Sequence, residues 1–300
     1  STPIKSSAAS DVYKRQFLWV LLFYFMTGLW IWKKNGQNRH IRISLAYVIM
    51  IILIWIPMAR RKSLAFLDVG QGDCFVADTK SGAIIFDGGS SSEDQVGRYR
   101  ILPYMKYLGY QKIQIAVISH MDIDHYSGIK ELLEMGKIKY LGLPEIPKDE
   151  TMKKIIGIAK KRGTTIFYLS RGRQITTKDG SLKVLHPQKN SQMEKNAASL
   201  VMQGKILGYR VLLTGDVEKE GEEELLSEEL ERADILKAAH HGSKNSTSNE
   251  FLQKVQPKQT VISCGKQNRY GHPHLETIHR LQTLSLIHIS EPTRLRRISY

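Results

Sequence analysis

Two long apolar runs without a charged residue lie near the N-terminus, at positions 17–32 and 43–59. Each is close to the shortest length that crosses a bilayer, roughly 17–25 residues. A polar stretch, "KKNGQNRHIR", separates them, and buried helices of a water-soluble domain would normally carry a polar stripe. We therefore predict a transmembrane helical hairpin over residues 17–62, with a buried helix pair as the alternative. Basic residues follow both runs, so the positive-inside rule leaves the orientation open.

The pattern changes at Ser63, where short β-rich runs broken by glycine turns begin. A continuous apolar run, "IQIAVIS", predicts a buried strand that ends just before position 120. Other strands are predicted at 65–69, 73–78, 83–86, 138–141, 165–168, 181–185, 200–203, 209–213, 235–238 and 260–263. Helices are predicted at 96–108, 129–135 and 218–232. Because strands and helices alternate only partly, we predict a layered α/β domain over residues 63–283.

The two ends of the chain fit no pattern near them. The first 16 residues end in "SSAASDVYKRQ", and residues 284–300 read "LSLIHISEPTRLRRISY". Both resemble translated sequencing-adapter read-through. We therefore predict that residues 1–16 and 284–300 are non-native tails and leave them out of the fold prediction.

The composition permits a sizeable core and indicates an anionic partner. The 300 residues are 42% hydrophobic and 24% charged, which makes global disorder improbable. The formal net charge of +15 favours nucleic acid or an acidic membrane surface, although basic flanks of a membrane protein would also produce it. Cys74 and Cys264 lie far apart without a CxxC motif, so we read both as core residues rather than disulfide or zinc ligands.

Four potential metal ligands follow the buried strand within six positions: His120, Asp122, Asp124 and His125. Ser127 and Gly128 then close the segment with small residues. Loops at strand ends are where α/β folds build ligand sites. Imidazole and carboxylate together suit zinc, manganese or iron better than calcium. The alternative is a solvated polar turn.

Two later strands end in residues of the same kind. "VLLTGDVE" presents Asp216, and "ADILKAAHHGSKNS" presents His240 and His241, followed by Ser243. Either segment alone could be an ordinary turn. Three strand ends that each deliver His or Asp are hard to explain independently, so we predict a site for one or two divalent ions.

These segments resemble the metallo-β-lactamase fold, an αββα sandwich. They resemble most the C-terminal domain of the ComEC family, the DNA-uptake channel of natural competence. The shared motifs occur in that family's order over residues 63–282: "FLDVGQGD", "IFDGG", "SHMDIDHYSG", "NAASLV", "LLTGD", "LKAAHHGS" and "YGHPH". The apolar pair before them fits the end of that channel's membrane region.

The resemblance implies a role for each matching position. Asp87 matches the aspartate that orders the ligand loop, and His120 the first histidine of the signature. Asp124 and His125 match ligands of the second metal, with Asp124 also able to orient the attacking water. Asp216 matches the carboxylate that bridges two metals and, with Asp124, is a candidate catalytic residue. One of the two adjacent histidines, 240 or 241, matches the last ligand, and the sequence leaves open which one.

The chain departs from the superfamily pattern at the first metal position. Asp122 stands where most members have a second histidine, and Asn196 and Ser199 lie where another histidine is usual. These changes make the position richer in oxygen donors. The resemblance therefore implies manganese or zinc, with manganese favoured by the oxygen-rich shell.

Several weaker candidates surround these residues. His272 and His274 either line the mouth of the site and meet a phosphate or pack in a turn. Asp73 in "DVGQGD" is expected to support the site from outside the ligand set, because the segment lacks the lysine and helix of a phosphate loop. Ser243 is a further supporting candidate, and His186 is expected to be structural.

The resemblance implies a metal-dependent hydrolase domain of a competence channel, acting as a nuclease on the DNA strand that is not transported. The alternatives are a metal-stabilised, non-catalytic module that guides DNA, and a hydrolase of a small phosphodiester or lactone. The implied partners are DNA, with single strands favoured, the membrane and other competence-channel components. The implied location is the bacterial cell membrane as a multi-pass protein, with the side of the hydrolase domain left open.

Overall fold

The computed structural model describes residues 22–25, 27–28, 45, 47–48, 62–193, 196–266 and 268–283. The chain divides into two compact units, Ser1–Arg61 and Lys62–Tyr300. Both predicted tails and most of the predicted hairpin lie outside the described residues. The described residues of the first unit are helical, and the Phe23 and Tyr47 rings lie 5.8 Å apart. Among the residues described, no helix is both long and apolar enough to cross a membrane.

The second unit contains two six-stranded sheets. The first, in the order β1 to β6, consists of β1 (Leu64–Phe66), β2 (Phe75–Thr79), β3 (Gly82–Phe86), β4 (Ile113–Val117), β5 (Ile138–Pro144) and β6 (Thr165–Leu169). The second, in the order β12 to β7, consists of β7 (Gln174–Thr177), β8 (Gly180–His186), β9 (Val201–Ile206), β10 (Tyr209–Leu213), β11 (Ile235–Lys237) and β12 (Gln259–Val261). Strands β3 to β6 and β10 to β12 are parallel, so each group ends at one edge of its sheet.

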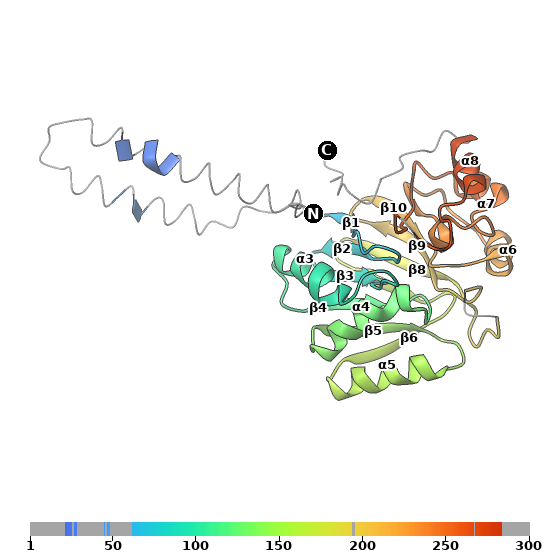
Figure 1. Cartoon of the computed structure of the whole chain (residues 1–300), viewed down its shortest axis with the longest axis horizontal. Coiled ribbons are helices and arrows are strands. Elements are labelled where there is room, and N and C mark those ends of the chain that lie inside the picture. Colours follow the sequence, from blue (N-terminus) through green and yellow to red (C-terminus); the bar gives the residue numbers. More distant parts are fainter. Residues whose placement is uncertain are drawn as a thin grey trace, which may run out of the picture. The chain divides into compact units, whose positions relative to one another are not determined.

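Helices cover the outer faces of both sheets (Figure 1). A π-helical turn (Gly97–Ile101), α3 (Leu102–Tyr107), α4 (Ile123–Glu134) and α5 (Glu150–Lys161) accompany the first sheet. The helices α6 (Lys219–Ser227), α7 (Asn249–Val255) and α8 (Leu275–Thr283) accompany the second, together with a 3-10 turn at Ala239–Gly242.

Side chains along each strand point alternately to its two faces, which divides the core into layers. In β2, Phe75 and Ala77 face the other sheet, while Val76 faces the helices of its own side. In β10, Val211 points between the sheets and Leu212 points to α6 and α7. One core therefore lies between the sheets and one under each helical layer. This four-layer arrangement confirms the predicted αββα sandwich.

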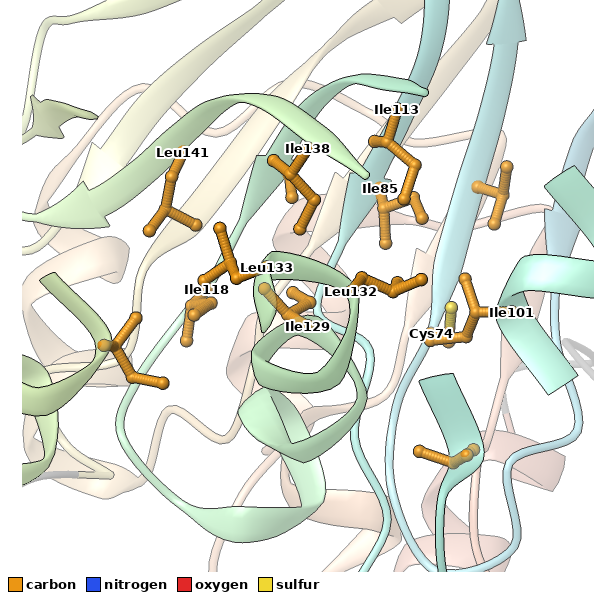
Figure 2. Close-up of a cluster of buried hydrophobic side chains, with 14 of the residues drawn as sticks. Cys74, Ile85, Ile101, Ile113, Ile118, Ile129, Leu132, Leu133, Ile138 and Leu141 are labelled. Carbon is orange, nitrogen blue, oxygen red and sulfur yellow. The ribbon is translucent and has the colours of Figure 1, made fainter. Parts of the chain in front are cut away.

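The helix that carries the ligand cluster is held by its buried face. Figure 2 shows Ile129, Leu132 and Leu133 of α4 among side chains of the neighbouring strands, including Ile118 and Ile138. All three helical residues are fully buried. Replacing such a buried side chain by alanine typically costs roughly 2–5 kcal/mol of folding free energy. This packing therefore fixes α4, and with it the first turn that carries Asp124 and His125.

The predicted strands correspond to observed ones, with shifts at their ends. The helix α4 begins at Ile123, earlier than predicted, so Asp124 and His125 lie in its first turn rather than in a loop. Four elements, α5, β7, α7 and α8, were not predicted. A signal for α5 was present, because the Asp149 carboxylate accepts a hydrogen bond from the Met152 amide as an N-cap.

Candidate metal centre

Strand ends from both sheets meet at one edge of the sandwich. Asp87 follows β3 directly, and His120 lies three residues after β4. From the second sheet, Asp216 lies just after β10, and His241 lies in the 3-10 turn after β11. These strands are parallel to their neighbours, so their carboxyl ends lie together. Residues far apart in the sequence are thereby brought to one place.

Glycines allow other loops to approach the first turn of α4. A Cβ at Gly89 would lie 2.6 Å from backbone atoms of Ile123, Asp124 and His125. The Gly88 amide donates to the His125 carbonyl at 2.8 Å, and the Asp73 amide donates to the Asp124 carbonyl at 3.0 Å. The "DVGQGD" and "IFDGG" segments therefore fix the ligand turn by backbone contact, which no larger residue at position 89 would permit.

Four buried residues form the centre of the site: Asp73, His125, Asp216 and His241. Their potential ligand atoms all lie within 4.8 Å of one another. The His125 Nε2 lies 3.2 Å from Asp216 Oδ2, and the His241 Nε2 lies 3.3 Å from the same oxygen. The Asp124 Oδ2 joins the cluster at 3.3 Å from the His241 Nε2. This group could hold a divalent ion.

The structure distinguishes the two adjacent histidines. Residues 240 to 242 have left-handed φ values of 48°, 53° and 84°, a strained turn for the two that are not glycine. This turn buries His241 in the cluster. The Nε2 of His240 lies 3.9 Å from Asp216, and its Nδ1 lies 2.8 Å from the Glu218 carboxylate. Geometry therefore favours His241 as the matching ligand.

The histidine rings are oriented as metal ligands usually are. The His125 Nδ1 lies 2.9 Å from the Asp87 carboxylate, whose other oxygen accepts from the Ser119 amide at 2.7 Å. The His241 Nδ1 lies 2.8 Å from the Ser263 carbonyl. The Nε2 atoms of both rings are buried and make no hydrogen bond. Unpaired buried donors and acceptors that converge in this way fit a bound cation.

Opposite charges dominate the electrostatics of the cluster. Burial lowers the pKa of His125, but the carboxylates of Asp216 and Asp87 outweigh it and raise that pKa well above its usual value. Burial acts on His241 in the same way, but Asp216 and Asp73 raise its pKa to about 10. Burial alone would raise the pKa of Asp124, yet its close contact with the His241 ring and the His125 charge lower it to about 2. Without metal, protons on the imidazoles neutralise the carboxylates, so an ion must displace them.

A lysine that the sequence analysis did not identify completes the cluster. Lys237 is buried on β11, and its Nζ forms an ion pair with Asp73. The same Nζ lies 3.4 Å from Asp216 Oδ1 and donates to the Gly215 carbonyl at 2.9 Å. A lysine inside the apolar run "DILKAA" was the available signal. Asp73, expected outside the ligand set, lies within the cluster of four because β2 begins at this edge.

Fewer of the residues predicted for the first metal position come close together. The His120 ring is buried, with its Nδ1 3.0 Å from the Ser119 hydroxyl, and its Nε2 lies 3.7 Å from the half-buried Asp122 carboxylate. The Ser199 hydroxyl accepts a hydrogen bond from the Asp216 amide at 3.3 Å. Asn196 contributes its carbonyl, which accepts from the Ser199 amide at 2.9 Å. These two polar residues therefore support the Asp216 turn.

The remaining candidates divide between the rim and the packed core. The His272 ring lies against the cluster, with its centroid 5.4 Å from that of His240. The His274 Nδ1 instead accepts a hydrogen bond from the Lys244 amide at 3.3 Å, as in a packed turn. The Ser243 carbonyl accepts from Thr277 Oγ1 at 2.8 Å, which ties the histidine turn to α8. His186 is buried with its Nε2 2.7 Å from the Ala197 carbonyl, consistent with a structural residue. Cys74 is buried as expected, but Cys264 is only half-buried.

Comparison with known proteins agrees with this geometry. The family model described as "Metallo-beta-lactamase superfamily" matches residues 67–266. The chain belongs to the metallo-β-lactamase superfamily. The metallo-β-lactamase-fold protein YhfI from Bacillus subtilis, whose crystal structure is known, has a TM-score of 0.52 and 13% identity, over 79% of this chain and 99% of that one. The superfamily implies divalent metal binding, and the Asp and His cluster is a candidate site for it.

The chain is also similar to curated proteins over part of their length. ComE operon protein 3 of Bacillus subtilis is 35% identical over 89% of this chain, and competence protein ComA of Neisseria gonorrhoeae is 30% identical over 69% of it. The chain spans 37% of the first relative's length and 27% of the second's. The predicted resemblance is confirmed, because these homologues are consistent with the metallo-β-lactamase-like domain of a ComEC-family competence protein.

Asp87→Asn is expected to weaken metal binding roughly 10- to 100-fold, the usual effect of removing a partner behind a metal-bound histidine. Asparagine tolerates the left-handed φ of 58° at this position. Its amide, however, cannot accept both from the Ser119 amide and from the His125 ring. A competition titration with a fluorescent chelator measures the change. Asp78→Asn, which alters a buried carboxylate paired with Lys62 at the other end of β2, is the control. Equal affinities of wild type and Asp87→Asn would contradict this role.

Proposed function

We propose that this domain is a metal-dependent hydrolase of phosphodiesters that cleaves DNA. The observation that carries the proposal is the convergence of Asp124, His125, Asp216 and His241, with both imidazole Nε2 atoms buried and unpaired. Asp73 and His120 stand beside this set as additional donors. Such a group of nitrogen and carboxylate donors suits zinc or manganese. A bound ion of this kind supplies Lewis acidity and an ionised water at neutral pH.

The residues of the chain have separable parts in the proposed reaction. Asp124 is ionised at neutral pH because its pKa is about 2, and it is only partly buried at the edge of the cluster. The ionised carboxylate can therefore orient a water molecule by accepting a hydrogen bond from it. Asp216 is deeply buried between the two histidines and serves to hold the cation. Lys237 forms an ion pair with Asp73 and lies close to Asp216, and so fixes the positions of both carboxylates.

The donor set favours manganese over zinc in this proposal. Asp122 replaces an imidazole by a carboxylate, and Ser199 and Asn196 add only hydroxyl and carbonyl groups near Asp216. Manganese accepts oxygen-rich shells, whereas zinc gains most from nitrogen and sulfur ligands. We therefore expect faster cleavage with manganese.

Two observations favour DNA as the substrate. One relative is named as a competence protein, and the domain at residues 63–283 has 31 basic against 27 acidic side chains; the rest of the chain's net charge of +15 lies before this domain and in the predicted tails. Proteins that hold nucleic acid through its phosphates bind less tightly as salt rises, so steep salt dependence is expected. We further propose that the substrate is the single strand that is not transported, and that the domain works at the bacterial membrane with other competence-channel components.

A cleavage assay tests the proposal. Labelled single- and double-stranded DNA are incubated with wild type and with Asp124→Asn, each with manganese or zinc. Asp124→Asn should slow cleavage on the order of 10²-fold, because the attacking water loses the carboxylate that positions it. Asp94→Asn, at an exposed carboxylate, is the matched control and should cleave as wild type does.

Each contrary result has a definite meaning. Cleavage that survives Asp124→Asn would indicate a contaminating nuclease. No cleavage with any metal, together with tight and salt-sensitive DNA binding, would favour the non-catalytic guiding module. The incomplete first metal position, where Asp122 is partly exposed and no histidine accompanies Ser199, is the feature consistent with that alternative.

A further inference from the structure

A stack of planar side chains leads from the cluster to the protein surface. The His272 ring lies 6.1 Å from that of His241 at an interplanar angle of 30°, and the Tyr270 ring lies 5.7 Å from His272 at 23°. The Arg269 guanidinium lies over Tyr270, 4.9 Å from its centroid. The outer two residues are exposed, and Tyr270 retains 44% of its accessible surface. The stack therefore begins at the candidate metal centre and ends in solvent.

The loop that carries this stack is held by one asparagine. The Asn268 Nδ2 donates to the carbonyls of Gly265 at 2.8 Å and His272 at 2.6 Å. Its Oδ1 accepts from the amides of Tyr270 at 3.2 Å and His272 at 2.9 Å. The Gly265 amide in turn donates to Gln71 Oε1 at 2.9 Å, which ties the loop to the "DVGQGD" segment. The rings are thus pre-positioned relative to the cluster.

Arg269, the outermost residue of the stack, adds a positive charge near the candidate metal centre. Arg269 Nη2 donates to the Tyr270 hydroxyl at 2.8 Å, and no carboxylate pairs with it within the described ranges of the chain. The hydrogen bond to Tyr270 raises the pKa of Arg269, and the Asp124 carboxylate adds to this effect. The guanidinium is therefore within electrostatic reach of the cluster, while its other N–H groups face solvent and can meet a phosphate.

We propose that the Arg269 guanidinium, held on the Tyr270 ring, forms with it a stacking subsite for a nucleobase of single-stranded DNA bound at the metal centre, with the outer face of Arg269 open to the base. The inference rests on the proposed function and adds to it a basis for recognising an unpaired strand. Aromatic rings and guanidinium planes stack on unpaired bases of any sequence, whereas bases within a duplex already stack on each other. A base held there would place an adjoining phosphate near His272 and the cluster.

The test measures binding and cleavage separately. The probes are a single-stranded oligothymidylate and an abasic oligomer with the same backbone, both bound in chelator, where no metal-dependent cleavage occurs. Tyr270→Ala should lower the affinity for oligothymidylate roughly 5- to 150-fold, as alanine substitution at one stacked base does. It should leave binding of the abasic oligomer unchanged. Tyr270→Phe keeps the ring and should bind oligothymidylate as wild type does.

Two controls separate this inference from the proposed function. Tyr99→Ala removes a still more exposed ring on the π-helical turn beside the first sheet and should change neither affinity. Cleavage of the abasic oligomer with manganese then tests the hydrolase without any base. Equal oligothymidylate affinities of wild type and Tyr270→Ala would overturn the stacking subsite even if both cleave the abasic oligomer. Failure of wild type to cleave any oligomer would overturn the hydrolase, while an affinity loss confined to oligothymidylate would still support the subsite.

Discussion

Asp216→Ala is expected to lose most of the bound metal and to lower DNA cleavage by more than about 100-fold, beyond the effect of an outer partner of a ligand. The Asp216 Oδ2 lies 3.2 Å from the His125 Nε2 and 3.3 Å from the His241 Nε2, so it stands between the two imidazoles. An ion bound by both rings would lose the carboxylate that neutralises it. Elemental analysis of the purified protein gives the metal content directly.

Further variants test whether the loss of bound metal comes from the missing carboxylate rather than from unfolding. Asp216→Asn keeps the shape of the side chain and should show the same loss, and circular dichroism at the assay temperature checks that both variants are folded. Asp94→Ala removes an exposed carboxylate and should retain the metal. Unchanged metal content in both Asp216 variants would refute the role of this residue as a shared ligand.

Lys237→Met is expected to destabilise the metal-free protein by roughly 3–5 kcal/mol, the usual cost of removing one partner of a buried ion pair. Burial lowers the pKa of Lys237, but Asp73 and Asp216 outweigh it and raise that pKa, so the side chain is a cation at neutral pH. Methionine would leave Asp73 without its ion pair and Asp216 with only His125 and His241 as positively charged neighbours. Urea unfolding in the presence of a chelator measures the difference in the free energy of unfolding.

Metal should reduce this destabilisation, because a bound cation neutralises the same two carboxylates. Unfolding of Lys237→Met with manganese in excess should therefore show a smaller loss than unfolding in chelator. Lys183→Met, an exposed lysine on β8, is the matched control and should be nearly neutral under both conditions. An equal loss with and without metal would show that Lys237 does not share its carboxylates with a cation.

The ligand segment differs from its sequence prediction at the start of α4. The apolar run before His120 predicts β4, and the small residues at 127–128 predict the close of a loop. The structure continues the helix through them, because Gly128 lets α4 approach Gly88 and Gly97: a Cβ at Gly128 would lie 2.6 Å from the Gly88 carbonyl. A glycine required by close packing and a glycine required by a turn look the same in a sequence.

Local sequence patterns were sufficient to predict most strands, the fold and the place of the candidate metal centre. Alternating and continuous apolar runs identified most strands, and the order of motifs identified the αββα sandwich and its family. The spacing from His120 to His125 and the strand ends at Asp216 and at 240–241 located the candidate centre. These features are local, because strand periodicity and the residues that follow a strand are both written in consecutive positions.

Only the tertiary structure brought Asp73 and Lys237 into the cluster and selected His241 over His240. Asp73 precedes β2 in one sheet and Lys237 lies on β11 in the other, so their ion pair depends on how the two sheets pack. The choice of histidine depends on left-handed backbone angles at both residues, which no side-chain pattern encodes. The stack from His241 to Arg269 likewise arises from a loop tied to Gln71, nearly two hundred positions earlier. Contacts between distant segments follow from packing free energy over the whole fold, and sequence periodicity carries no information about them.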